Sequence, residues 1–93
     1  MTSKERAALR KQANTITAIF QIGKEDVTEP LVEAVDAALQ KRELIKLSVL
    51  ETCPSSVRDA ANRLAAKTEA EVVQTIGRKM VLYRERREEE PLC

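Results

Sequence analysis

The residues of this sequence that are best suited to chemistry are a glycine and several cations, and that chemistry is phosphate binding. Gly23 ends an apolar run, Lys24 follows it, and Thr28 and Pro30 then open a new periodic segment. This order predicts a strand, a tight loop and the start of a helix. Such a junction offers the N–H groups of a first helical turn beside a glycine that permits close approach. Every α/β protein has strand-to-helix turns, so this stretch alone supports a phosphate site only weakly.

Catalytic and metal-binding patterns are missing from the sequence. The chain contains no histidine, so the usual general base at neutral pH is absent. Cys53 and Cys93 lack metal-ligand spacing, and we expect both to be free thiols. No Walker-type or dinucleotide-binding glycine pattern occurs. We therefore expect a protein that is not an enzyme and that requires no metal or other cofactor.

Length and composition predict one small domain. The 93 residues are 43% hydrophobic and 33% charged, which suits a modest core and a highly charged surface. No apolar run approaches the roughly 18 residues of a membrane span, and the N-terminus has no hydrophobic signal region. We expect a cytoplasmic, monomeric protein.

The net charge of +1 is a cancellation between oppositely charged blocks. Residues 1–24 carry five basic side chains and one acidic, whereas residues 25–52 carry seven acidic and three basic. Residues 53–87 are basic again, with eight bases and four acids. A basic surface made by part of the chain would attract polyanions although the whole molecule hardly does.

The first predicted helix is amphipathic. Thr2 and Glu5 form a capping box, and the helix runs to about Asn14. The side expected to pack contains Ala8, Leu9, Gln12 and Ala13, with Ile16 just beyond. The opposite arc contains Lys4, Arg6, Ala7, Arg10, Lys11 and Asn14. Most arcs of this kind are ordinary solvated faces, but four bases without an acid make a surface for nucleic acid the alternative to consider.

The remaining chain predicts an α/β domain with the element order α-β-α-β-α-β-β. Strands are expected at residues 18–22, 43–50, 71–76 and 79–84, and helices begin at caps Thr28 and Ser56. In the second strand Leu44 and Leu50 indicate that both faces are partly covered. The strand–helix–strand order predicts a parallel pair, and Gly77-Arg78 predicts a type II′ hairpin turn. Residues 1–85 form the domain, and residues 86–93 are expected to be a charged, flexible tail.

Four separated blocks of this chain resemble the CRM domain in its bacterial single-domain form, the YhbY family. They cover nearly the whole chain and occur in the family's order. The blocks are Thr2-Ser3-Lys4 with Leu9-Arg10-Lys11-Gln12-Ala13, Ile19-Phe20-Gln21-Ile22-Gly23-Lys24, Arg42-Glu43-Leu44-Ile45-Lys46-Leu47, and Val73-Gln74-Thr75-Ile76-Gly77-Arg78 leading to Leu82-Tyr83-Arg84.

The resemblance implies both a fold and a function. The fold is a single compact α/β domain similar to the C-terminal domain of translation initiation factor three, with a four-stranded mixed sheet packed by helices. The function is RNA binding, with ribosomal RNA and the precursor of the large ribosomal subunit as partners and a role in its assembly. Residues expected to contact RNA are Lys4, Arg6, Arg10, Lys11, Gly23, Lys24, Arg78 and Lys79.

The family's loop is usually Gly-x-x-Gly, whereas this chain has Asp26 at the second glycine position, preceded by Glu25. If that position needs a positive φ, aspartate tolerates it better than most residues. Two negative charges where a phosphate would approach predict a weaker loop contact, with more of the affinity carried by the first helix.

A second hypothesis is a protein-interaction adaptor. In that hypothesis the acidic second helix, with Glu29, Glu33 and Asp36, meets a basic ribosomal protein. The acids Glu33 and Asp36 are expected to face solvent.

Overall fold

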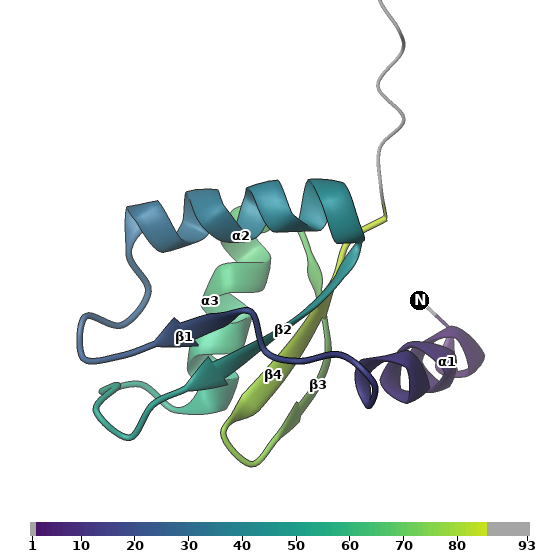
Figure 1. Cartoon of the computed structure of the whole chain (residues 1–93), viewed down its shortest axis with the longest axis horizontal. Coiled ribbons are helices and arrows are strands. Elements are labelled where there is room, and N and C mark those ends of the chain that lie inside the picture. The colour runs from purple at the N-terminus through teal and green to yellow at the C-terminus, as the bar shows by residue number, and fades with distance from the viewer. Residues whose placement is uncertain (1, 86–93) are drawn as a thin grey trace, which may run out of the picture.

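The computed structural model describes residues 2–85, and the predicted tail lies outside this range. None of the described helices is long and apolar enough to cross a bilayer. The observed element order is the predicted one (Figure 1). The elements are α1 (Ser3–Ala13), β1 (Phe20–Ile22), α2 (Glu29–Arg42), β2 (Leu44–Val49), α3 (Val57–Thr68), β3 (Glu71–Ile76) and β4 (Lys79–Tyr83).

The strands form one four-stranded mixed sheet in the order β1-β2-β4-β3. β1 and β2 are parallel, and β4 pairs antiparallel with both β2 and β3. These pairings confirm the α/β fold class with its mixed sheet. Gly77 has a φ of 58°, and Arg78 lies outside the positive-φ region, which are the signs of φ expected of the predicted type II′ turn.

Each helix begins at a hydroxyl residue that the sequence identifies. The side-chain oxygens of Thr2, Thr28 and Ser56 accept hydrogen bonds from the backbone N–H three residues later. The capping box of α1 differs from the usual arrangement, in which the acidic side chain accepts a hydrogen bond from the backbone N–H of the cap residue. Here Glu5 Oε1 accepts a hydrogen bond from the Thr2 hydroxyl. Local sequence therefore fixes where all three helices start.

The main core lies between the sheet and the helix pair α2 and α3. Alternation in β2 buries Ile45, Leu47 and Val49 on this face. Leu39 of α2 and Leu64 of α3 pack against them and are fully buried. Burial of this apolar surface is the main stabilising contribution to the fold.

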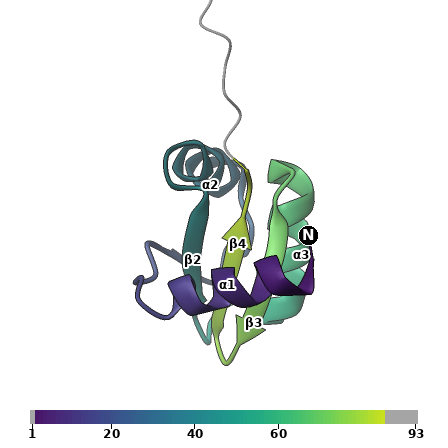
Figure 2. The same ribbon diagram turned by 90° about the vertical axis from the view of Figure 1, so that its right-hand side faces the viewer.

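Helix α1 crosses the opposite face of the sheet (Figure 2). The core beneath it is small, with Ala13, Val73 and Val81 buried and Leu9, Leu44 and Tyr83 at its margin.

Two details of the predicted α1 stripe are wrong. Ala8 and Gln12 are exposed, and the contact line is instead Arg6, Leu9, Ala13 and Ile16. The reason is that a helix resting alone on a sheet buries only a narrow line of side chains, which leaves the flanking positions in solvent. The second face of β2 is partly covered, as predicted: Leu44 packs at the core beneath α1, whereas Leu50 is 39% exposed.

Arg84, directly after β4, joins α2 to the end of α3. Its guanidinium donates to Asp36 Oδ1 at 2.5 Å, to the Asp36 carbonyl at 2.9 Å and to the Thr68 carbonyl at 2.8 Å. It also donates to Gln40 Oε1 at 3.2 Å, and its side chain is only 11% exposed. Asp36 faces solvent as expected, with its side chain 55% exposed, but its ion pair with Arg84 adds a structural role that the sequence did not indicate.

Replacing Arg84 with methionine should lower the free energy of unfolding by about 2 kcal/mol, because the aliphatic stem remains while several charge-assisted hydrogen bonds are lost. Arg78→Met is the matched control, since Arg78 is 58% exposed and its Glu51 partner lies at 3.6 Å. Urea unfolding of both variants measures the difference. Equal stability of the two variants would contradict a structural role for Arg84.

Candidate nucleic-acid interface

Three loops meet at one end of the sheet. Because β1 and β2 are parallel, the loop at Gly23 and the loop after Leu50 leave the sheet together (Figure 1). The hairpin turn joins them, because Ser48 near the end of β2 pairs with Lys79 at the start of β4. Arg78 lies in the turn just before Lys79, and its carbonyl accepts a hydrogen bond from the Val49 N–H at 2.6 Å. The structure thus brings together the glycine loop and the hairpin cations.

Lys79 lies on the face of the sheet that carries α1. Val81, two residues further along β4, belongs to the core beneath α1, and residues two apart in a strand share a face. Ser48 pairs with Lys79, so it lies on the same face. This agrees with Lys46, two residues before Ser48, which reaches α1 directly.

Helix α1 presents most of its cations outward from this same face. Lys4, Arg10 and Lys11 are exposed, whereas Leu9 and Ala13 face the sheet. None of the ion pairs found within residues 2–85 involves a cation of α1. These positive charges are therefore available to a polyanion.

Arg6 differs from the other predicted contact residues of α1. It is half-buried, and its Nη1 donates to the carbonyl of Val72 at 3.3 Å. Part of its hydrogen-bonding capacity is used to hold α1 against β3.

Gly23 is not required by the fold. Its φ is not positive, and a Cβ at this position would lie 3.6 Å from Leu50 Cδ1 and 3.7 Å from Thr52 Oγ1. Both distances are ordinary van der Waals contacts. The absent side chain instead leaves the loop backbone accessible, next to the exposed Lys24.

The start of α2 offers fewer free N–H groups than the sequence predicts. Pro30 has no N–H, and those of Leu31 and Val32 bond to the side chain and carbonyl of Thr28. The helix cap therefore uses donors that an anion would need.

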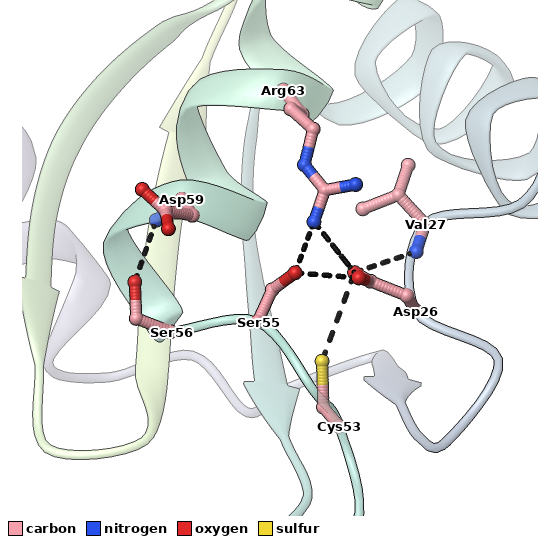
Figure 3. A network of polar contacts seen from close by, with 7 residues as sticks. All are labelled: Asp26, Val27, Cys53, Ser55, Ser56, Asp59 and Arg63. Carbon is pink, nitrogen blue, oxygen red and sulfur yellow. Dashed lines mark hydrogen bonds and ion pairs between the residues drawn. The ribbon is translucent and has the colours of Figure 1, made fainter.

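Asp26 anchors the loop to α3 (Figure 3). Its φ is 61°, so the second glycine position of the family does require a positive φ here. The carboxylate accepts from Ser55 Oγ at 2.5 Å and, through both of its oxygens, from Arg63 Nη2 at 2.9 Å. The N–H of Val27 and the free thiol of Cys53 also donate to it.

These contacts change the electrostatics expected of the loop. Hydrogen bonds from Ser55 and then Arg63 lower the pKa of Asp26 from its ordinary value of 3.8. The Asp26 charge is therefore paired within the protein, and the expectation of two free negative charges is wrong. Only Glu25 is exposed with its charge toward solvent.

Comparison with known proteins identifies the family. The model for the "CRS1 / YhbY (CRM) domain" matches residues 1–84. This chain belongs to the CRM domain family. The CRM identity also fits the loop geometry, since the position that family members fill with glycine has a positive φ here.

Relatives extend over most of this CRM domain. "Probable RNA-binding protein YqeI" of Bacillus subtilis is 41% identical over 88 residues, which cover 95% of this chain and 92% of the relative. An "RNA-binding protein" of Haemophilus influenzae is 30% identical and covers 90% of this chain and 85% of the relative. The solution structure of hypothetical protein SAV1595 from Staphylococcus aureus superposes with a TM-score of 0.80 at 39% identity. That match covers 97% of this chain and 94% of the other.

Two residues that shape the interface have no local signature in the sequence. Lys46 Nζ donates to the carbonyls of Ala13 and Ile16, at 3.1 and 3.4 Å, and so places a positive charge at the C-terminal end of α1. Arg63 lies 37 residues after its partner Asp26. Alternation in β2 predicts the face that Lys46 occupies but not the carbonyls it binds.

The Asp26 anchor should make stability depend on pH. Because the pKa of Asp26 is lowered on folding, its contribution is present at neutral pH and is lost as pH falls below about 4. Wild type should therefore exceed Asp26→Asn in stability at neutral pH, and the gap should close in acid. Urea unfolding across this range measures it, with Glu25→Gln as the exposed control. A gap independent of pH would contradict the anchor.

Proposed function

We propose that this CRM domain binds structured RNA without catalysing a reaction, chiefly through phosphate contacts. The observation that carries the proposal is that cations from α1 and from the start of β4 lie on one face of the sheet, and that the accessible Gly23 loop emerges at the end of the sheet where Lys79 lies. The names of the relatives support RNA as the polyanion. A surface of separated cations suits recognition of backbone and shape rather than of base sequence.

The contacts that supply affinity are unequal. Lys4, Arg10 and Lys11 of α1 supply most of it, and Lys24 and Lys79 extend the surface. Two further cations contribute less. The guanidinium of Arg78 lies 3.6 Å from the carboxylate of Glu51, and that of Arg6 donates to the carbonyl of Val72. With few aromatic side chains in the chain, stacking is a minor source of affinity.

The target that best suits this domain is ribosomal RNA in a precursor of the large ribosomal subunit, whose assembly the protein would assist. The family resemblance supports this target. The adaptor hypothesis has less support, because Asp36, one of its three acids, is already paired with Arg84 within the domain.

Salt dependence tests the phosphate contacts. If about four phosphates are neutralised, the logarithm of the binding constant should fall against the logarithm of salt with a slope of about −3 to −4. Reversing charge at Arg10 and Lys11 should make the slope shallower by about 2 and weaken binding similarly for all RNA sequences.

A matched control for that variant is charge reversal at Lys41 and Lys67. This pair also lies in last helical turns, but on the α2 and α3 layer. Its reversal changes the net charge equally and should leave the slope unchanged. Equal loss of affinity in both double variants would show that only net charge matters and would remove α1 from the interface.

The ribosomal target is tested in a cell extract. The tagged protein should co-sediment with large-subunit precursors, and ribonuclease treatment should release it, because RNA carries the contact. Cross-linking in cells followed by sequencing of the attached RNA identifies the site. Retention of protein partners after complete ribonuclease digestion would favour the adaptor hypothesis instead.

A further inference from the structure

Within residues 2–85, two large hydrophobic side chains are exposed to solvent. Leu50 is 39% exposed and Ile76 is 61% exposed. Single exposed apolar residues are normal on a protein surface. Two such residues indicate an interaction site only if the fold brings them to a common surface.

Strand register places both on the face that carries α1, at the end of the sheet that this helix does not cross (Figure 2). Ile76 pairs with Lys79, and residues opposite each other across a strand pair share a face. Leu50 continues β2 two residues beyond Ser48, and its N–H still bonds to the Ile22 carbonyl at 2.8 Å. Its side chain also lies beside the position where a Gly23 side chain would be.

Polar side chains lie between these two apolar ones. Register aligns Gln21, Ser48, Lys79 and Ile76 in one row across all four strands. Four strands spaced about 4.8 Å apart make a row roughly 14 Å wide. We call Gln21, Gly23, Ser48, Leu50, Ile76 and Lys79 the open face. It combines apolar contact, hydrogen-bonding groups and a positive charge.

This combination fits an unpaired nucleotide better than a duplex. A base that is not stacked in a helix has an apolar face and free hydrogen-bonding edges, and it remains attached to a phosphate. A continuous RNA duplex presents to a protein mainly phosphates, hydroxyls and a shallow groove. None of these is an apolar surface that exposed leucine and isoleucine side chains would contact. The exposed cations of α1 lie on the same side of the sheet and would hold the adjoining helical backbone.

We infer that the open face binds an unpaired nucleotide, so that the RNA is recognised where a duplex is interrupted by a bulge, loop or end. The inference rests on the proposed function and narrows its substrate class. The base would lie against Leu50, with its edge toward Gln21 and Ser48 and its phosphate toward Lys79, and Ile76 would extend the apolar surface beyond Lys79. Aliphatic contact of this kind does not select one base, so the preference is for the absence of pairing rather than for a sequence.

The experiment compares two RNA hairpins that have the same stem, one continuous and one with a short internal bulge. The full chain should bind the bulged hairpin about tenfold more tightly. A third hairpin, whose bulge consists of abasic nucleotides, should bind no better than the continuous one. This third probe tests the role of the base without altering the protein.

Protein variants locate the contact. Leu50→Ser with Ile76→Ser should remove the preference for the bulge and leave affinity for the continuous hairpin unchanged. Ile76→Val, which keeps an apolar surface, should retain the preference. Lys79→Ala should weaken binding to both hairpins.

Three results would overturn the inference. They are equal affinity of the full chain for bulged and continuous hairpins, full preference for the abasic bulge, and a preference that survives the double serine substitution. Each of these leaves phosphate binding through α1 intact. Failure to bind any of the hairpins would instead contradict the proposed function.

Discussion

A four-stranded sheet has two faces, and three helices within residues 2–85 cover them unequally. Helices α2 and α3 pack on one face, where Leu47 and Leu82 are fully buried. The single helix α1 covers only part of the other, where Val81 is buried and Leu50 is not. The uncovered part lies at the end where the glycine loop and the hairpin turn emerge. The candidate interface is therefore the surface that the helices of residues 2–85 leave uncovered.

Cations in this domain have two distinct uses. Lys46, Arg63 and Arg84 hold separate elements together by binding carbonyls or carboxylates far away in the sequence. The exposed cations of α1 have no such partner among the ion pairs of residues 2–85. The structural cations fix the loop and α1 in place, and the exposed ones give that side of the molecule its charge. A count of basic residues cannot separate these uses, because the distinction depends on tertiary contacts.

Short-range signals in the sequence predicted most of the fold. Hydroxyl residues such as Thr28 and Ser56 set the helix starts, and alternation around Leu47 set the buried face of β2. The order of strands in the sheet and the partners of Arg63 and Arg84 depend on long-range packing, which no local pattern encodes. The same limit explains the error at Gln12, whose exposure depends on how closely α1 approaches the sheet. The residues of the candidate site could be named from the sequence. That they share one face of the sheet follows from the strand register, which only the structure shows.

The small core beneath α1 has a consequence for motion. Only Ala13, Val73 and Val81 are buried there, so this helix has less apolar anchorage than α2 or α3. Elements with few buried contacts open at a lower free energy than the whole domain unfolds. Transient detachment of α1 would carry its cations away from the sheet, and a polyanion that contacts both would favour the docked state. Ligand occupancy and the docking of α1 are then thermodynamically linked.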